Sequence, residues 1–403
     1  MPTTIGWIWP HCPGVSQYPK SSTTISIFFD SMKTIGITGQ HGFVGYHLYQ
    51  RLKLLKDEFR LVEFDRSFFD DERALQDFTR QCDVIVHLAA INRHEDPEVL
   101  YETNRNLAEK LVNAMNGRQR PAHIIFSSSS QESLDNLYGK SKKEARISLA
   151  DWAVRTGNTF TGLVVPNVFG PFGRPYYNSV VATFCYRLTH DEIPVIDVDR
   201  ELSLIYVGEL VEEIIRAIRN PVHEPERVVQ ATAQATVSEI LRTLQEFRLI
   251  YQEKGEMPKI RNRFEHQLFN TYRCFMDLGG YFPRKFTLHA DARGAFVEIA
   301  RLGIPGQVSF STTHPGVTRG NHFHTRKIER FAVISGKALI QLRKIGTEEV
   351  FEFYLDGQEP AYVDMPVWYS HNIRNVGDEV LYTIFWIDEP YDAADPDTFF
   401  ESV

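Results

Sequence analysis

The stretch KTIGITGQHGFVGYHLYQRLKLL, residues 33–55, places a glycine-rich turn between two runs of different pattern. The apolar run before the glycines predicts a short β-strand, and the longer run after them predicts a helix. Gly39 permits the tight turn, Gly42 lets the backbone approach a pyrophosphate, and Gly45 lets helix and strand pack closely. The amides at the start of the helix would face the phosphates. The expected cofactor contacts here are Gly39, Gly42, Phe43, Val44 and Gly45. The alternative is a glycine-rich turn without a ligand.

Strands and helices alternate after this stretch. We expect strands over 60–65, 83–90 and 123–130, and helices over 97–115 and 138–157. This alternation predicts a parallel, doubly wound α/β sheet of the Rossmann type.

The pattern changes after about residue 282. Short strands separated by Gly, Pro and Asp turns follow, which predicts a β-sandwich or a small barrel. We therefore expect two domains, 32–282 and 283–403. Residues 1–31 lack the pattern of a signal peptide, and Met32 stands directly before the first expected strand. We expect 1–31 to be a poorly ordered upstream extension.

The composition excludes several classes of function. The chain has 403 residues, a formal net charge of −8 and no basic tract, so it does not suggest a nucleic-acid partner. No apolar run approaches the length that spans a bilayer. The four cysteines are far apart and form no C-x-x-C pair, so we expect a reducing compartment, the cytoplasm.

Asp65 at the end of the second expected strand and Arg66 directly after it bear on the choice of cofactor. Asp65 lies 20 residues after Gly45, where an acidic residue usually takes the ribose hydroxyls of NAD. Arg66 instead suits the 2′-phosphate of NADP. Asp65 thus favours NAD, whereas Arg66 favours NADP. Our interpretation is NADP(H), with NAD left open.

The segment Tyr138-Gly-Lys-Ser-Lys142 begins one of the expected helices. Positions i and i+4 share a helix face, so the two side chains would lie together. An ammonium beside a phenol favours the phenolate and would lower the pKa of Tyr138 from its solution value of about 10. Tyr138 could then exchange a proton with a sugar oxygen near neutral pH. The alternative is an exposed helix face.

These pieces resemble the extended short-chain dehydrogenase/reductases that act on nucleotide sugars. The matching stretches, over about residues 33–250, are TGQHGFVG, HLAA, Asn104, FSSSS, YGKSK and PNVFGP. The resemblance implies a catalytic serine at Ser129, with Ser128 and Ser130 as alternatives, beside Tyr138 and Lys142. It further implies cofactor contacts at Leu88, Ala89, Tyr138 and Lys142 and substrate contacts at Asn167 and Asn178. For Asn178, the alternative is a role in capping its loop.

A second candidate site lies in GVTRGNHFHTRKIERFAVISG, residues 316–336, and in a later P-x-W-x2-H-x3-N segment. Histidines at i and i+2 on a strand point to the same face, so His322 and His324 would project together. Glu329 would come from the following strand and His371 from a later one. Three imidazoles and one carboxylate suit zinc, iron, manganese or nickel.

The whole spaced set resembles the two signature motifs of cupins, which are all-β jelly-roll barrels. The resemblance implies a divalent metal held by His322, His324, Glu329 and His371, and zinc is our choice. Trp368 stands where the second motif usually has glycine. We expect it to narrow the mouth of the pocket.

Two stretches in the same region, DARGAFVEIAR (291–301) and TRGNHFH (318–324), resemble the deoxysugar 3,5-epimerases. The resemblance implies that Arg293 holds the nucleotide phosphates and that Arg319 lies near the sugar. It places the catalytic base at His322, which the cupin pattern makes a metal ligand. One nitrogen cannot do both, so the base stays open, with Tyr369 and Tyr382 as alternatives. We favour His322 as a ligand.

The order of the two parts resembles the bifunctional capsular-polysaccharide enzymes of UDP-N-acetyl-L-fucosamine synthesis, as do the stretches 176–186 and 396–403. The resemblance implies a UDP-linked 4-keto-6-deoxy-N-acetylhexosamine, epimerised at C3 by the cupin and then reduced at C4 with NADPH. The product would be UDP-2-acetamido-2,6-dideoxy-L-talose for capsule or O-antigen synthesis, made by a homodimer. The rivals are a single-function reductase whose cupin only dimerises the chain, and a metal-dependent oxygenase.

Overall fold

The computed structural model describes residues 32–286, 289–291, 294–296, 306–389 and 392–403. The expected upstream extension 1–31 and the expected phosphate contact Arg293 lie outside the described residues. Lys33–Val403 forms one compact unit, and the boundary expected between residues 282 and 283 stays a prediction.

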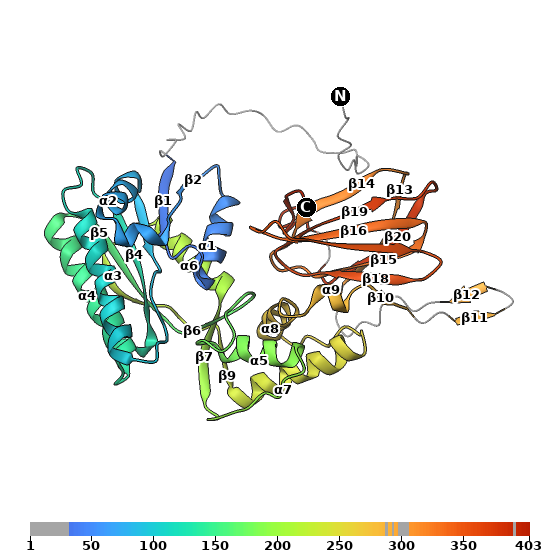
Figure 1. Ribbon diagram of the computed structural model, residues 1–403, viewed down its shortest axis with the longest axis horizontal. Coiled ribbons are helices and arrows are strands. Elements are labelled where there is room, and N and C mark those ends of the chain that lie inside the picture. Colours follow the sequence, from blue (N-terminus) through green and yellow to red (C-terminus); the bar gives the residue numbers. More distant parts are fainter. Residues whose placement is uncertain (1–31, 287–288, 292–293, 297–305, 390–391) are drawn as a thin grey trace, which may run out of the picture. The chain divides into compact units, whose positions relative to one another are not determined.

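A six-stranded sheet forms the centre of the N-terminal part (Figure 1). All its pairings are parallel, and the strand order is β2-β1-β3-β4-β5-β8. The chain leaves β1 towards β2 on one side and returns to β3 on the other, so the order reverses between β1 and β3, where α/β sheets bind ligands. The strands are β1 (Lys33–Thr38), β2 (Phe59–Val62), β3 (Val84–His87), β4 (His123–Ser129), β5 (Thr159–Val165) and β8 (Glu224–Val228).

Helices cover both faces of this sheet (Figure 1). Helices α1 (Phe43–Lys53) and α6 (Val207–Arg219) share one hydrophobic cluster with the strands. Helices α2 (Glu72–Gln81), α3 (Pro97–Met115) and α4 (Leu137–Thr156) share the other. This layering confirms the predicted doubly wound sheet.

The remaining elements before residue 282 are a small sheet and a group of helices. The sheet has the order β6-β7-β9, from β6 (Asn167–Phe169), β7 (Glu201–Tyr206) and β9 (Ala233–Thr236). The helices are η1 (Arg66–Asp70), η2 (Ser130–Ser133), α5 (Val180–Thr189), α7 (Val237–Phe247), the π-helix η3 (Arg248–Glu253), α8 (Arg263–Arg273) and α9 (Leu278–Tyr281).

The C-terminal part consists of two five-stranded sheets, with all pairings antiparallel, and a hairpin of β11 (His289–Asp291) and β12 (Gly294–Phe296). One sheet joins β10 (Arg284–Lys285), β18 (Ala361–Met365), β15 (Glu329–Ser335), β20 (Leu381–Ile387) and β13 (Gln307–Thr313). The other joins β17 (Val350–Asp356), β16 (Lys337–Lys344), β19 (Tyr369–Asn375), β14 (Thr318–Phe323) and β21 (Phe399–Phe400).

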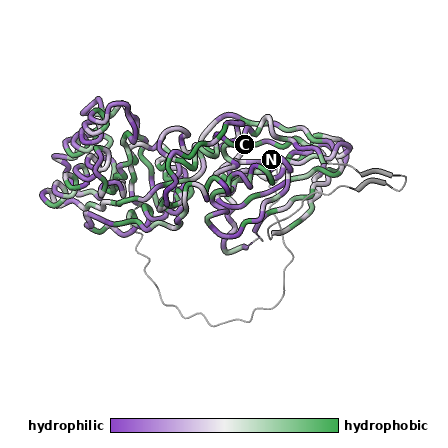
Figure 2. Tube along the Cα trace, turned by 90° about the horizontal axis from the view of Figure 1, so that it is seen from below, coloured by the Kyte–Doolittle hydropathy of each residue, from purple (hydrophilic) through white to green (hydrophobic). Residues whose placement is uncertain are grey.

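Hydrophobic and hydrophilic residues are interspersed along the trace of the chain (Figure 2). Buried side chains of both sheets, such as Val333 and Ile340, belong to one hydrophobic cluster. The predicted all-β barrel is therefore confirmed. The same cluster includes Phe247 of α7 and Tyr251 of η3, so these helices and the β-sheets share one core.

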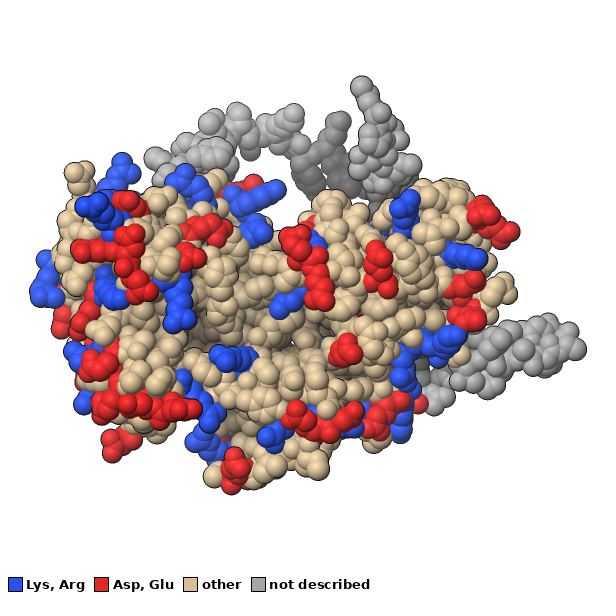
Figure 3. Space-filling model, in the orientation of Figure 1, with Lys and Arg blue, Asp and Glu red and all other residues tan. Residues whose placement is uncertain are grey.

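The described surface carries charged side chains of both signs (Figure 3). On the face drawn in Figure 3, basic and acidic side chains of the described residues are interspersed rather than gathered by sign. Within the described residues, no helix has the length and apolar character needed to cross a bilayer.

Candidate active site and metal centre

A cleft of about 480 Å³ opens beside the glycine-rich loop and the ends of β4 and β5. It brings together most of the residues that the sequence predicted for the first site. Those that line it are Gly39, Gly42, Phe43, Val44, Gly45, Leu88, Ser129, Tyr138, Lys142, Asn167 and Asn178. Ala89, Asp65 and Arg66 were predicted as well but do not line it.

The loop geometry agrees with the roles expected for the glycines. Gly39 has a φ of +78°, and a Cβ there would lie 2.9 Å from the backbone nitrogen of Ala89. A Cβ on Gly45 would lie 2.1 Å from the carbonyl oxygen of Gly39. Gly42 is the N-cap of α1 and provides no side-chain cap, so the first amides of the helix remain available for phosphate.

Ala89 lies behind the loop instead of on the cleft. Its amide donates to Thr38 Oγ1 at 3.3 Å, and its backbone packs against Gly39. The neighbouring Ala90 lines the cleft in its place. The direction of each residue after the strand end cannot be read from the sequence, and the cofactor contact expected at Ala89 stays a prediction.

The residues predicted to select the cofactor differ in what they contact. The Asp65 carboxylate accepts hydrogen bonds from the amide and the hydroxyl of Ser67, at 2.8 and 2.6 Å, and so caps η1. The side chain of Arg66 is exposed and makes no hydrogen bond or ion pair with the described residues. The carboxylate of Asp65 is therefore already engaged in capping η1, whereas the guanidinium group of Arg66 has no partner within the described residues.

Hydrogen bonds and position distinguish the three candidate catalytic serines at the end of β4. The hydroxyl of Ser128 is buried and donates to Glu132, which also forms a buried ion pair with Arg146 at 2.7 Å. Ser130 does not line the cleft. Ser129 lines it, and its hydroxyl interacts with Tyr138. The geometry thus favours Ser129 over its two neighbours.

Tyr138 does not have the lowered pKa that the sequence suggested. Burial raises its pKa to about 12, Ser129 opposes that rise, and Tyr177 adds to it. Burial also lowers the pKa of Lys142 to about 8. The ammonium group of Lys142 lies 4.4 Å from the ring centre of Phe126. Desolvation is therefore the largest cause of both pKa shifts, because burial disfavours the charged form of each group.

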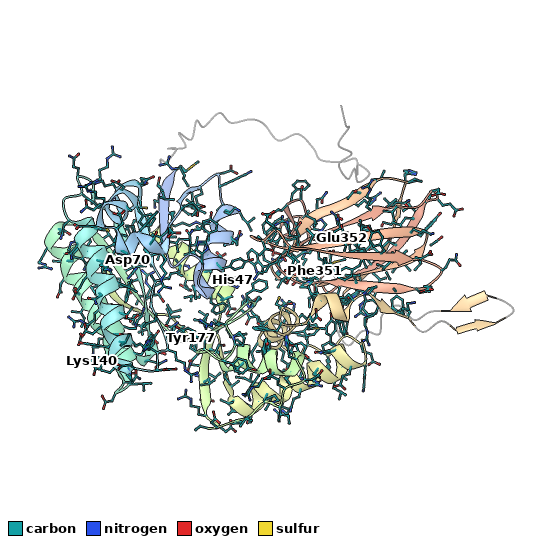
Figure 4. The ribbon with its side chains drawn as sticks, in the orientation of Figure 1. His47, Asp70, Lys140, Tyr177, Phe351 and Glu352 are labelled. Atoms are coloured by element: carbon teal, nitrogen blue, oxygen red, sulfur yellow. The ribbon has the colours of Figure 1, made fainter. Side chains whose placement is uncertain are left out.

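Further cleft residues escaped the sequence analysis, among them His41, Asn92 and Tyr177. The Tyr177 hydroxyl oxygen accepts a hydrogen bond from the Asn92 amide at 2.8 Å, which leaves its own proton available to a ligand. Tyr177, labelled in Figure 4, belongs to the stretch 176–186 that the sequence analysis singled out. The sequence analysis assigned a role to Asn178 in this stretch and none to Tyr177.

The four predicted metal ligands converge in the C-terminal barrel. The Nε2 atoms of His324 and His371 both lie 3.1 Å from Glu329 Oε2, and that of His322 lies 4.0 Å from it. The ligand atoms of all four residues lie within 4.8 Å of one another. His322 and His371 are direct partners in the β14–β19 pairing, and Glu329 begins β15 on the other sheet.

The unsatisfied atoms at this point fit a divalent cation. His324 Nε2, Glu329 Oε2 and His371 Nε2 are buried, and none has a hydrogen-bond partner within the described residues. Buried polar atoms normally have partners, so three orphans aimed at one point indicate a ligand. Three imidazole nitrogens and one carboxylate form a donor set that zinc accepts.

His322 is the most accessible of the four, with 23% of its side chain exposed. A β-bulge between Gly320 and His322, with φ of +57° at Asn321, directs it into the group. Gly320 has a φ of +94°, and a Cβ there would lie 2.8 Å from the carbonyl oxygen of His371. Burial lowers the pKa of His322 to about 3, so its imidazole is neutral at pH 7, as a ligand must be.

Trp368 does not narrow the mouth of the metal pocket, and that expectation was wrong. Its ring packs 5.6 Å from that of Phe323, whose side chain points away from His322 and His324 because faces alternate along a strand. Its other neighbour is His47 of α1, at 5.8 Å. The φ of Trp368 is +63°, which explains why glycine suits this position.

The two tyrosines proposed as alternative bases lie at different distances from the ligands. Tyr369 is buried and lies two residues before His371 on β19. Tyr382 is 42% exposed and pairs with Ser335, six residues beyond Glu329 on β15. At about 3.3 Å per residue, Tyr382 is roughly 20 Å away along the strand. Arg319 lies on β14, three residues before His322.

Two sequence families match the chain. The one described as "NAD dependent epimerase/dehydratase family" matches residues 35–231, and the one described as "Polysaccharide biosynthesis C-terminal domain" matches residues 289–399. The UDP-2-acetamido-2,6-beta-L-arabino-hexul-4-ose reductase of Pseudomonas aeruginosa is 33% identical over 369 residues, which are 91% of this chain and 98% of that protein. The spore coat polysaccharide biosynthesis protein SpsL of Bacillus subtilis is 26% identical over 130 residues, which are 30% of this chain and 86% of that protein.

Solved structures agree with these matches. The capsular polysaccharide assembling protein CapF from Staphylococcus aureus is 34% identical, with a TM-score of 0.59, and the match covers 92% of this chain and 100% of that chain. RMD from Pseudomonas aeruginosa, solved with NADPH, is 17% identical with a TM-score of 0.51, covering 60% of this chain and 98% of that one. The second likeness concerns the fold alone.

Proposed function

Because this chain belongs to the family of capsular-polysaccharide UDP-sugar reductases, with an epimerase/dehydratase-type domain before a C-terminal polysaccharide-biosynthesis domain, we propose that it acts twice on one sugar nucleotide. The substrate is a UDP-linked 4-keto-6-deoxy-N-acetylhexosamine. The C-terminal barrel inverts C3, and the N-terminal cleft then reduces C4. The product is UDP-2-acetamido-2,6-dideoxy-L-talose, a precursor for capsule or O-antigen.

The observation that carries this proposal is the convergence of His322, His324, Glu329 and His371 in a chain that also has the Ser129–Tyr138–Lys142 cleft. The C3 hydrogen of the substrate is acidic because it lies next to the C4 ketone. A base removes it, and an acid returns a proton on the other face. Reduction removes the ketone and with it this acidity, so epimerisation comes first.

In the barrel, the four ligands would hold a zinc ion that supplies positive charge beside the enolate oxygen. Since His322 is then a ligand, the proton at C3 is taken by another group. Tyr369 is the candidate that the geometry retains, because it lies two residues from His371 while Tyr382 lies far along the sheet.

The residues around the glycine-rich loop would hold NADPH in the cleft, where the cofactor would supply the hydride for C4. Tyr138 donates its proton to the C4 oxygen, Ser129 donates a hydrogen bond to the same carbonyl, and Lys142 supplies the positive charge that makes the phenol a better acid. Asn167 and Asn178, which line the cleft, hold the sugar nucleotide at the open side of that cleft. The engagement of Asp65 in capping η1 and the exposed guanidinium of Arg66 support NADP(H) over NAD.

The decisive experiment follows hydrogen exchange at C3. The purified protein is incubated with the 4-keto sugar nucleotide in D2O without nicotinamide, and C3 is observed by NMR. We expect deuterium to enter at C3. If none enters while reduction proceeds when NADPH is added, the chain is a single-function reductase and its barrel serves another purpose, such as dimerisation.

A matched variant separates the two steps. Tyr138→Phe removes only the phenolic oxygen, so it should keep C3 exchange and lose C4 reduction by about 10²–10⁴-fold, the usual contribution of a general acid. Reduction at the wild-type rate by this variant would show that another group donates the proton. Binding of NADPH, followed by its fluorescence, should remain unchanged and confirms that the cleft is intact.

A further inference from the structure

Asp397 is a buried acidic residue that neither half-reaction uses. It is 3% exposed and lies in the segment between β20 and β21. Its carboxylate accepts hydrogen bonds from three consecutive backbone amides, those of Thr325, Arg326 and Lys327, at 2.9–3.2 Å. It also accepts one from the Thr325 hydroxyl at 2.6 Å. Converging backbone amides form an anion-binding nest, and here the anion comes from the chain itself.

This nest begins one residue after His324, and Asp397 contacts that histidine as well. The backbone carbonyl oxygen of Asp397 lies 2.5 Å from His324 Nδ1. A carbonyl oxygen can only accept, so the proton of the neutral imidazole sits on Nδ1 and the lone pair is on Nε2. That lone pair faces Glu329 Oε2, 3.1 Å away.

The segment is fixed on both sides of Asp397. The ammonium group of Lys327 donates to the carbonyl of Pro396 at 3.0 Å. Just beyond, Phe399 and Phe400 of β21 pair with Phe323 and His322 of β14. The backbone that carries two of the metal ligands is therefore held by a segment more than 70 residues later in the chain.

We infer that Asp397 is a positioning residue of the barrel's metal centre. Its carboxylate holds the turn after His324 in place, and its carbonyl selects the tautomer that presents Nε2 to a divalent cation. This inference rests on the proposed metal site. A residue that only anchored the segment would affect the melting temperature but not the affinity or the coordination of the metal.

The test uses the full chain with Zn²⁺ and Co²⁺ as probes. Zn²⁺ affinity is measured by competition with a chromophoric chelator, and the coordination is followed by the visible absorption of Co²⁺. Asp397→Ala should weaken Zn²⁺ binding by roughly 10–100-fold, the usual effect of losing an outer contact to a metal ligand, and should alter the Co²⁺ spectrum. Asp397→Asn keeps one acceptor oxygen and should lie between Asp397→Ala and the wild type.

Asp395→Ala is the matched control. Asp395 is two residues away, its side chain is 68% exposed, and it pairs with the guanidinium of Arg326 at 2.8 Å. The substitution therefore removes a carboxylate from the same segment but leaves the carboxylate that the three backbone amides bind. It should bind Zn²⁺ within twofold of the wild type. NADPH binding, which belongs to the other site, should be unchanged in all variants.

The outcomes separate this inference from the proposed function. If the wild type binds Zn²⁺ and Asp397→Ala binds it equally well with the same Co²⁺ spectrum, Asp397 is only an anchor and the inference is wrong. If Asp397→Ala does not fold, the same decision is made with Asp397→Asn. If the wild type binds neither ion, the metal site itself is refuted, and this inference with it.

Discussion

The hydroxyl of Tyr251 donates a hydrogen bond to the carboxylate of Asp364, 113 positions further along the chain, and both groups are buried. Tyr251 belongs to the π-helix η3, and Asp364 lies on β18 of the barrel. Arg330 of β15 binds the same carboxylate at 2.8 and 3.1 Å, and Arg273 donates to the Tyr251 oxygen at 3.1 Å. Arg330 thus binds the buried carboxylate directly, and Arg273 is linked to it through the Tyr251 hydroxyl.

Removing this carboxylate should destabilise the chain strongly. Asp364→Asn leaves Arg330 and Arg273 buried without a counter-charge, so we expect a loss of about 3–5 kcal/mol in the free energy of unfolding. Urea denaturation measures it. Glu359→Gln, which breaks an exposed ion pair with Lys285 on the same part of the barrel, serves as the control and should change little. A loss below about 1 kcal/mol for Asp364→Asn would show that water or another group compensates.

The exposed guanidinium of Arg66 leads to a prediction about cofactor choice. If it binds the 2′-phosphate, Arg66→Ala should weaken NADPH about 10-fold or more, as the loss of a charge-assisted hydrogen bond implies, and leave NADH unchanged. Both dissociation constants can be measured by fluorescence. Arg73→Ala, another exposed arginine nearby in the sequence, is the control. An equal effect of Arg66→Ala on both cofactors would contradict the assignment.

The lowered pKa of Lys142 makes cofactor binding pH-dependent. Burial lowers this pKa to about 8, so the side chain is charged below that pH and neutral above it. The charged form attracts the anionic cofactor, hence affinity is highest below about pH 8 and falls as the pH rises through it. Between about pH 7 and 9.5 we expect roughly a 10-fold loss of NADPH affinity. Lys142→Met should bind more weakly with no such decline, and a wild-type affinity independent of pH would count against Lys142 as the titrating group.

The left-handed backbone at Trp368 predicts an unusual order of stabilities. Replacing Trp368 removes packing against Phe323 and His47, so any small residue destabilises the barrel, by about 3–5 kcal/mol for alanine. Glycine relieves the strain of a φ of +63° whereas alanine keeps it. Trp368→Gly should therefore be more stable than Trp368→Ala by about 1 kcal/mol, measured by thermal or urea unfolding. The reverse order would mean that the local backbone rearranges in both variants.

The sequence was sufficient for the parts of the fold that depend on local pattern. The strand, glycine loop and helix of residues 33–55 are all present, and the histidine pair with Glu329 and His371 does converge. These features depend on spacing along the chain, which a sequence displays directly. The family resemblance already pointed to Ser129, and the structure added a reason to prefer it to Ser128, whose hydroxyl donates to Glu132.

Other features could not be read from the sequence for physical reasons. The pKa of Tyr138 depends on how deeply the phenol is buried, and spacing contains no such information. Trp368 was placed at the pocket mouth because its motif is near His371, but its side chain lies on the other side of the strand pair. Asp397 lies in an acidic stretch that resembles a solvated surface, and its partners are about 70 residues earlier.

The pairing of β21 with β14 has a consequence for the order of events during synthesis. Ribosomes deliver the chain from its N-terminus, and domains fold as they emerge. The residues that line the cofactor cleft end at Ser179 and the sheet that carries them ends with β8, whereas His322 and Phe323 gain their β21 partners only when residues 399 and 400 have left the ribosome. We therefore expect the cleft of the N-terminal sheet to form before the four ligand residues of the proposed metal centre are held in place.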